Sequence, residues 1–234
     1  MCFHNSIFVK ASKLAVRYGK NISVVEIAEK ILEEQKYHAN AFAFAEYPVI
    51  TSAPNIQFFN WGLIPSWTKT VKEAQEIRKF TINARSDNVF DRASFSEPIL
   101  RRRCLIPSTG YFEWRHERDR TIPYFIYLPN EEVFSMAGIY DIWRDKEAGD
   151  VFTSFSIITT EANRLTDYIH NTKHRMPVIL SKDNEKDWLD PLLSKSDIEN
   201  LLIPYDADKM DAYIIRNDFL KKVPNDPSIL EKVR

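Results

Sequence analysis

Val133-Phe-Ser-Met-Ala-Gly-Ile-Tyr-Asp-Ile-Trp143 is the stretch on which the fold class depends, because its β-branched and aromatic residues predict one long strand. Segments 124–128 and 151–159 lie on either side of it and have the same character. Turns separate the three segments, as expected of neighbouring antiparallel strands. The sequence therefore predicts an α+β fold with a twisted, antiparallel, barrel-like core and surrounding helices, and not a doubly wound parallel sheet.

Shorter strands and helices are predicted around these three segments. Thr160 is the expected N-cap of a helix that runs to His170, and Pro107 is expected to interrupt a strand. The proline-containing tail from about residue 223 is expected to be irregular. The further strands are expected at 2–9, 41–50, 56–61, 104–106, 110–115, 176–180 and 213–215. The further helices are expected at 23–36, 71–79, 183–189 and 197–202.

Composition narrows the class of protein. The chain has 234 residues, of which 44% are hydrophobic, and this suits a single domain over residues 1–234. The net charge of −1 does not mark a strong binder of polyanions. No apolar run approaches the roughly 20 residues of a membrane span, and no signal peptide is expected. Because the two cysteines form no disulfide framework and have no zinc-like spacing, we expect a cytoplasmic protein without a metal site. We also expect a monomer that needs no cofactor.

Cys2 follows the initiator methionine and becomes the N-terminal residue if Met1 is removed. It would then carry an α-amine with a pKa of about 8 beside a thiol with a pKa of about 8.5, so both nucleophilic forms are accessible near neutral pH. Such an aminothiol condenses with an aldehyde to an imine and then closes a thiazolidine ring. The alternative interpretation is a small buried hydrophobic residue, which is the commoner fate of a free cysteine.

Glu113 lies among aromatic residues in the segment Gly110-Tyr-Phe-Glu-Trp114. A buried carboxylate in such surroundings has a raised pKa and suits proton transfer. Strand alternation gives the opposite interpretation, with Glu113 facing the solvent.

A loop is predicted for Asn83-Ala-Arg-Ser-Asp87. In this loop the Asn83 side chain can hold a substrate oxygen or an amine, and Arg85 can bind phosphate. The alternative interpretation is a simple turn without a binding role.

His170 and His174 are both candidates for acid–base chemistry near neutral pH, although a surface histidine is the commoner case. Trp67 lies in a proline-bounded loop, where it either stacks on a nucleobase or anchors the core, and the core is the favoured interpretation. Cys104 lies within an apolar strand and is expected to be a core residue.

Taken in order along the chain, these segments resemble the SOS-response-associated peptidase (SRAP) family, which shields abasic sites in single-stranded DNA. Each motif is weak by itself, but the ordered set is specific and covers most of the chain, thinning after Trp188. The matching pieces are Met1-Cys2, Trp61-Gly-Leu-Ile-Pro-Ser-Trp67, Asn83-Ala-Arg-Ser-Asp87, Arg103-Cys-Leu-Ile-Pro-Ser-Thr-Gly-Tyr-Phe-Glu-Trp114, Ala137-Gly-Ile-Tyr140, Ile158-Thr-Thr-Glu-Ala-Asn163, Ile169-His170 and Arg175-Met-Pro-Val-Ile-Leu180.

The resemblance implies a single SRAP-type domain with a basic cleft for single-stranded DNA that contains abasic sites. It implies that Cys2, freed of Met1, bonds covalently to the ring-opened sugar aldehyde during DNA repair. Asn83 would position the terminal amine, Glu113 would be the acid–base group, and His170 would assist opening of the sugar ring. The residues that would line the DNA path are Trp67, Arg85, Thr159 and Arg175.

Two departures from the family pattern bear on these roles. Phe3-His4 stands where the family often has Gly-Arg, so a phosphate-contacting arginine would be replaced by a weaker, pH-dependent donor. Four residues separate His170 from Arg175, where the usual pattern has one, so His174 is a rival for the catalytic histidine.

Two further functions are compatible with the sequence. One is a cysteine peptidase whose minimum activity is removal of its own Met1, since a cysteine beside a base suits acyl chemistry. The other is a non-catalytic module that binds single-stranded DNA, indifferent to abasic sites and to Cys2.

Overall fold

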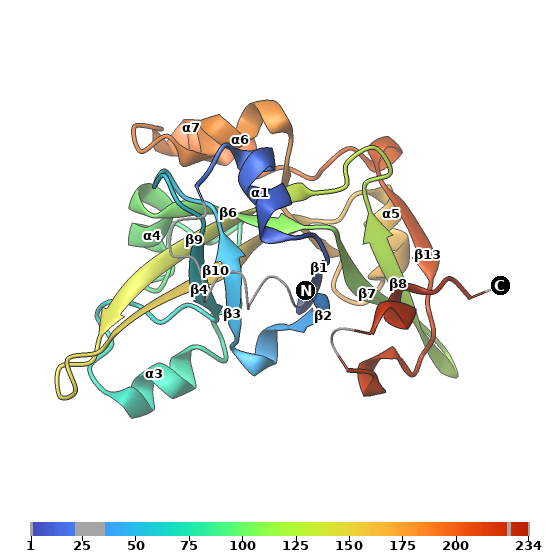
Figure 1. The fold of residues 1–234 in the computed structure, drawn as a ribbon, viewed down its shortest axis with the longest axis horizontal. Coiled ribbons are helices and arrows are strands. Elements are labelled where there is room, and N and C mark those ends of the chain that lie inside the picture. The colour runs from blue at the N-terminus through green and yellow to red at the C-terminus, as the bar shows by residue number, and fades with distance from the viewer. Residues whose placement is uncertain (1, 22–35, 224–225, 234) are drawn as a thin grey trace.

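The computed structural model describes residues 2–21, 36–223 and 226–233, which form two β-sheets with helices around them (Figure 1). The first sheet is antiparallel and has the order β13-β8-β7-β1-β2. Its strands are β1 (His4–Ile7), β2 (Lys36–Asn40), β7 (Gly110–Glu117), β8 (Arg120–Tyr127) and β13 (Asp211–Ile214). The helices described are α1 (Ala11–Tyr18), α3 (Val71–Ile77), α4 (Ser96–Arg101), α5 (Arg164–Ile169), α6 (Lys182–Leu189) and α7 (Lys195–Leu201).

The second sheet is mixed and is built around a long antiparallel pair, β9 and β10. It has the order β12-β9-β10-β4-β3, with β6 also paired to β9 and with β5 and β11 also paired to β10. Its strands are β3 (Glu46–Val49), β4 (Gln57–Trp61), β5 (Asn83–Arg85), β6 (Arg103–Ser108), β9 (Phe134–Arg144), β10 (Val151–Glu161), β11 (Arg175–Pro177) and β12 (Ile179–Leu180).

The α+β class is confirmed, as is the antiparallel pairing of segments 133–143 and 151–159, whereas residues 124–127 belong to β8 and pair with β7 and β13 in the first sheet. Residues of β10 from Val151 to Ile157 pair in register with residues of β9 from Arg144 to Gly138. The barrel-like core takes the form of two open sheets, because the described strands do not close into a barrel. One hydrophobic cluster contains side chains from both sheets, including Ile7 and Tyr111 from the first and Trp61 and Phe155 from the second. Burial of this shared apolar surface holds the sheets together.

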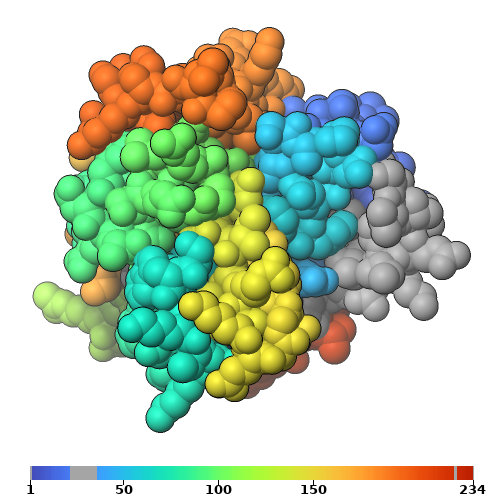
Figure 2. All heavy atoms as spheres, turned by 90° about the vertical axis from the view of Figure 1, so that its left-hand side faces the viewer, coloured from blue at the N-terminus to red at the C-terminus, as the bar shows by residue number. Residues whose placement is uncertain are grey.

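The outer faces of the second sheet carry most of the helices. In Figure 2, α3 (teal), α4 (green) and the outer ends of β9 and β10 (yellow) form one face of the molecule, with α6 and α7 (orange) along its upper edge. No helix within the described ranges is long and apolar enough to span a membrane. The helix predicted at 23–36 lies almost wholly outside the described residues.

The prediction that Pro107 breaks a strand is wrong, because β6 continues through it to Ser108. The backbone of Leu105 bonds with that of Ile50, on the side of β6 that faces away from β9. Strand alternation places the nitrogen of Pro107 on this same side, where it interrupts no bond of the β6–β9 ladder. Proline is tolerated there for the same reason that it is tolerated in edge strands.

The helix predicted from Thr160 begins later, at Arg164. Thr160 belongs to β10 and pairs with Met176 of β11, so its backbone is extended. Asn163 is the N-cap instead, and its side chain accepts a hydrogen bond from the backbone N–H of Thr166. Both residues have good capping side chains, and the tertiary pairing of β10 with β11 decides between them.

Two other segments differ from their predictions. The strand expected at 41–50 is confined to β3, because Asn40 caps a short 3-10 turn (Ala41–Ala43) that precedes it. The tail is less irregular than expected, because Pro227–Leu230 forms a 3-10 turn and Ile229 is buried. This turn belongs to a cluster with Phe112 and Phe219, so the tail covers one face of the first sheet.

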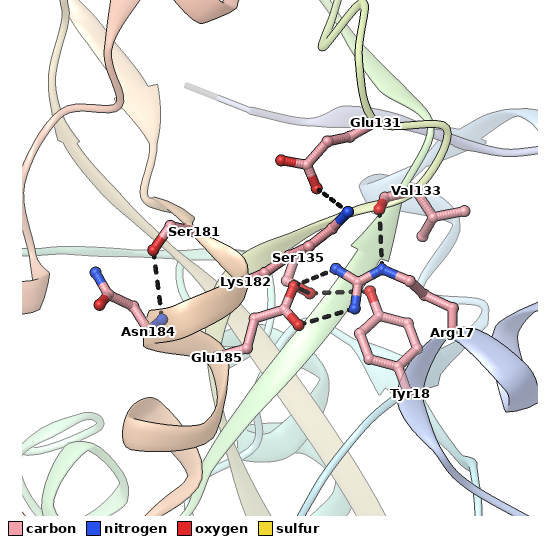
Figure 3. A network of polar contacts seen from close by, with 9 residues as sticks. All are labelled: Arg17, Tyr18, Glu131, Val133, Ser135, Ser181, Lys182, Asn184 and Glu185. Atoms are coloured by element: carbon pink, nitrogen blue, oxygen red, sulfur yellow. Dashed lines mark hydrogen bonds and ion pairs between the residues drawn. The ribbon is translucent and has the colours of Figure 1, made fainter.

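A largely buried ion pair joins α1 to α6 (Figure 3). The guanidinium of Arg17 donates to both carboxylate oxygens of Glu185, at 3.0 and 2.6 Å, and its Nε donates to the carbonyl of Val133. Ser135 on β9 donates to Glu185 at 2.7 Å and lies 2.9 Å from the hydroxyl of Tyr18. Every charged atom of the pair therefore has polar partners, which is the condition for a stable buried ion pair.

Replacing Arg17 with methionine is expected to lower the free energy of unfolding by about 3 kcal/mol, because it leaves the carboxylate of Glu185 buried without its cation. The two side chains of the ion pair are only 20% and 10% exposed. Thermal denaturation should show a fall in Tm of roughly 6–12 °C for a chain of this size. Lys13→Met on the same helix is the control, because the Lys13–Glu132 pair is 55% and 53% exposed and contributes about 1 kcal/mol or less. Equal Tm values for the two variants would contradict the expectation.

Candidate functional site

Four side chains from distant parts of the sequence meet between the two sheets. Cys2 precedes β1, Asn83 opens β5, Glu113 lies on β7, and His170 follows the last residue of α5. Asn83 donates a hydrogen bond from Nδ2 to the carbonyl oxygen of Cys2 at 3.0 Å. His170 Nε2 lies 3.8 Å from Glu113 Oε2. The pairing of β1 with β7, and of β5 with β10, brings these strands to one place.

Cys2 is fully buried in the chain that still carries Met1. Burial raises the pKa of its thiol, and the negative charge of Glu113 raises it further. The thiol is therefore protonated at neutral pH in this form of the protein. The accessible thiolate was predicted for the chain freed of Met1 and stays a prediction, whereas in the chain with Met1 Cys2 is the small buried residue of the alternative interpretation.

Glu113 is buried, so the interpretation in which it faces the solvent is wrong. Its strand β7 lies in the middle of the first sheet, between β8 and β1. Phe112 on the opposite face is covered by Phe219, whose ring stacks on it at 5.0 Å. Both faces of β7 are therefore covered, and alternation does not expose Glu113. Burial raises the pKa of its carboxyl group to about 7, so the acid form is well populated at neutral pH.

His170 is buried, and burial lowers its pKa to about 4, so the ring is neutral at pH 7. Its Nδ1 lies 2.9 Å from the carbonyl oxygen of Arg175. A carbonyl only accepts hydrogen bonds, so Nδ1 carries the ring proton and the lone pair of Nε2 is on the side of Glu113. His174 is instead exposed, adopts a left-handed φ of 53°, and has its Nδ1 2.6 Å from Asp167. Only His170 of the two lies in the cluster.

Asn83 lies in a strand and not in the predicted loop, because β5 pairs in parallel with β10. Its backbone is paired with that of Ile157, which fixes the direction of its side chain. While Nδ2 holds the carbonyl of Cys2, Oδ1 is buried and has no hydrogen-bond partner among the described residues. Asn83 therefore retains an acceptor next to the backbone of Cys2.

The four residues predicted to line a DNA path divide into an outer and an inner pair. Trp67 is 54% exposed, so the interpretation of it as a core anchor is wrong, and Arg85 is exposed and paired with Asp87. Both line one hollow of about 590 Å³ together with Asn83. Thr159 and Arg175 are buried, and the guanidinium of Arg175 donates to the carbonyl of Thr159 at 2.6 Å. Thr159 therefore lies beneath Arg175 and holds it in place.

His4 does not take the place of a surface arginine. Its Nδ1 lies 2.8 Å from Nε2 of His38, and its ring meets the edge of Trp114 at 4.9 Å. Burial, with a smaller contribution from His38, lowers its pKa to about 3, so the ring is neutral. Phe3, with the opposite orientation, lines the hollow.

Sequence reasoning missed Asn171, whose side chain pairs with the backbone of β7. Its Nδ2 donates to the carbonyl of His116 at 2.8 Å, and its Oδ1 accepts from the N–H of His116 at 3.0 Å. Arg115, one residue earlier on β7, donates to the carbonyl of Tyr168. Residues 168 and 171, on either side of His170, are thus both fastened to the strand that carries Glu113. The four-residue spacing before Arg175 was the only sign of this in the sequence.

Replacing Asn171 with alanine is expected to raise the pKa of His170 from about 4 toward the ordinary value of 6.5, because a loosened loop admits water to the ring. NMR titration of the histidine ring protons measures this directly. Thr172→Ala is the matched control, since Thr172 is an exposed residue of the same loop. An unchanged titration of His170 in Asn171→Ala would show that the two bonds do not position it.

Comparison with known proteins gives concordant results. A family model described as SOS response associated peptidase (SRAP) matches residues 1–221. The chain is 35% identical over 210 residues to the abasic site processing protein YoqW of Bacillus subtilis, covering 87% of this chain and 90% of that protein. It is 33% identical over 150 residues to the abasic site processing protein HMCES of Gallus gallus, covering 56% and 44% of the two chains.

Solved structures share the fold. A Bacteroides thetaiotaomicron protein is 59% identical with a TM-score of 0.97, and the match covers both chains completely. A Bordetella bronchiseptica protein is 23% identical with a TM-score of 0.77 over 92% of this chain and 100% of that one, which supports the fold alone. Among the residues that the structure describes, no three histidine, cysteine or acidic side chains are grouped as metal ligands. From the match over residues 1–221 and the identity to YoqW, the chain belongs to the SOS response associated peptidase (SRAP) family.

Proposed function

We propose that this protein processes abasic sites by forming a covalent thiazolidine between Cys2, freed of Met1, and the sugar aldehyde in single-stranded DNA. The observation that carries the proposal is the meeting of Cys2, Asn83, Glu113 and His170 in one buried cluster. The names of the relatives YoqW and HMCES, both abasic site processing proteins, point to the same substrate.

Opening of the sugar ring is the first chemical step, because an abasic sugar is mostly a closed hemiacetal. The His170 ring is neutral with its proton on Nδ1, so Nε2 is the basic nitrogen and takes the proton of the anomeric hydroxyl. Glu113, with its pKa near 7, donates its proton to the ring oxygen as the bond between that oxygen and the anomeric carbon breaks. The separation of 3.8 Å between the two groups lets one sugar contact both. The products are the aldehyde and a free hydroxyl.

Bond formation then needs both groups of the terminal residue. The α-amine of Cys2 attacks the aldehyde carbon, water leaves, and an imine forms. The thiol sulfur adds to the imine carbon, its proton passes to the nitrogen, and the five-membered ring closes. Asn83 supports this geometry, because Nδ2 fixes the carbonyl of Cys2 and Oδ1 is available to accept from the amine. Holding the reacting groups together gains the proximity advantage of an intramolecular reaction.

The hollow beside the cluster supplies the DNA path. Trp67 stacks on a base, while Arg85 offers a cation to the phosphate backbone. Arg175, held by Thr159, lies 3.6 Å from Asp87, the partner of Arg85, and so joins the same charged group. Contacts of this kind hold a single strand without reading its sequence.

Intact-protein mass spectrometry after incubation with single-stranded DNA containing one abasic site tests the proposal. The expected adduct has the mass of the protein without Met1, plus the DNA, minus one water. Peptide mapping should place the bond at residue 2. The proposal fails if no adduct survives denaturation, or if the adduct forms equally on chains that retain Met1.

A further inference from the structure

We propose that Phe3 and Phe42 form a stacking platform for the nucleobase next to the abasic site. The inference rests on the proposed function and adds a subsite to it. The two rings lie with centroids 5.0 Å apart at an interplanar angle of 46°. Phe3 follows Cys2 directly, so the platform begins one residue from the reacting atoms.

The platform lines the hollow that borders the catalytic cluster at Asn83. Phe3 and Phe42 line that hollow of about 590 Å³ together with Asn83, which holds the backbone of Cys2. Phe42 is 51% exposed, and it shares the hollow with the exposed rings of Trp67 and Phe80, so it belongs to a group of exposed aromatic side chains. A strand threaded past Cys2 thus brings a base that flanks the lesion to these rings.

The chemistry of the remaining lining identifies single-stranded nucleic acid as the occupant. Trp67 and Phe80 are two further exposed aromatic side chains in the same hollow. Arg85 and Arg92 add cations there. Aromatic faces interleaved with cations match a chain of bases joined by phosphates, whereas an apolar peptide segment has no anionic groups to place beside the cations.

The platform also changes the kind of contact made beside the reactive residue. The His4 ring is turned toward His38 and is neutral, so residues 3 and 4 offer no cation to a phosphate. Stacking on Phe3 and Phe42 releases no counterions, unlike a phosphate contact. Affinity gained at this subsite is therefore independent of salt, while affinity gained at Arg85 falls as salt rises.

The test uses single-stranded DNA with a tetrahydrofuran abasic analogue, which has no aldehyde, and with 2-aminopurine on one flank or the other. Wild type is expected to quench 2-aminopurine on one flank. Phe42→Ala and Phe42→Leu should lose that quenching and bind about tenfold more weakly, since stacking contributes about 1–3 kcal/mol per base. The slope of affinity against salt should be unchanged in both variants and shallower in Arg85→Ala.

Phe152→Ala is the matched control, because Phe152 is an exposed phenylalanine that packs on Trp143 and does not line the hollow. It should bind and quench like wild type. Unchanged quenching and affinity in Phe42→Ala would overturn the platform while leaving the crosslinking reaction intact. Retained quenching in Phe42→Leu would show that no aromatic ring is needed and would overturn it as well. A wild type that does not bind the analogue would overturn the platform together with the proposed function.

Discussion

Replacing Cys2 with serine is expected to abolish the adduct that survives denaturation while leaving an imine that borohydride can trap. Serine keeps the terminal amine, so condensation with the aldehyde still occurs. Its hydroxyl is a far weaker nucleophile than a thiol, so the ring that protects the imine from hydrolysis does not form. We expect the stable yield to fall by about two orders of magnitude or more, because the unprotected imine hydrolyses on denaturation. Denaturing electrophoresis with and without borohydride separates the two species.

Cys104→Ala is the control for this experiment. Cys104 is the other cysteine of the chain, and it is fully buried in β6 with its backbone carbonyl bonded to Trp188. Its burial confirms the prediction that it is a core residue. The variant should give the full yield of stable adduct. If Cys2→Ser keeps that yield, the thiazolidine mechanism is wrong.

Replacing Glu113 with glutamine is expected to slow crosslinking by about 10²–10³-fold, which is the usual contribution of a positioned general acid. Glutamine keeps the shape of the side chain and has no proton to give. The acid form of Glu113 is lost as the pH rises through its pKa of about 7. The wild-type rate should therefore decline above pH 7, and this decline should be absent from the residual activity of the variant. Single-turnover rates between pH 5.5 and 8.5 measure both effects.

Two measurements show whether the slower crosslinking of Glu113→Gln comes from the missing acid, and not from unfolding or from a retained Met1. Because burial raises the folded-state pKa of Glu113 from 4.5 to about 7, ionisation destabilises the fold increasingly across that interval and fully above it. Glu113→Gln should thus be at least as stable as wild type at pH 8. Intact mass must show that Met1 is absent, since a retained Met1 blocks the amine.

Glu117→Gln is the control variant. Glu117 lies at the exposed end of the same strand, beside Arg120, so this variant should crosslink at the wild-type rate. A normal rate in Glu113→Gln would exclude it as the acid.

The fold class could be predicted from the sequence because the β-branched and aromatic residues of long runs such as 133–143 strongly favour extended strands. These runs form β9 and β10. Where local preferences were balanced, distant partners decided the outcome. Asn83 and Arg85 have turn-like neighbours, yet they form β5 because β10 offers a free edge. Thr160 has a side chain that could cap a helix, but its backbone pairs with β11 and is therefore extended.

The site was predicted less evenly than the fold. Cys2, Asn83, Glu113 and His170 were all named in advance, but through a resemblance to a family, since no local pattern relates residues so far apart. Strand alternation misled at Glu113, because Phe219, from the other end of the chain, covers Phe112 on the opposite face of β7. The exposure of Trp67 and the inward turn of His4 toward His38 likewise depend on tertiary neighbours.

The burial of Cys2 has a practical consequence for anyone who expresses this protein. A purification tag placed ahead of residue 1 leaves the nitrogen of Cys2 inside an amide bond, and an amide cannot condense with an aldehyde. Under the proposed mechanism, such a preparation would give a false negative in every adduct assay. The tag belongs at the C-terminus. A tag at the N-terminus must be followed by a protease site whose cleavage leaves Cys2 as the first residue.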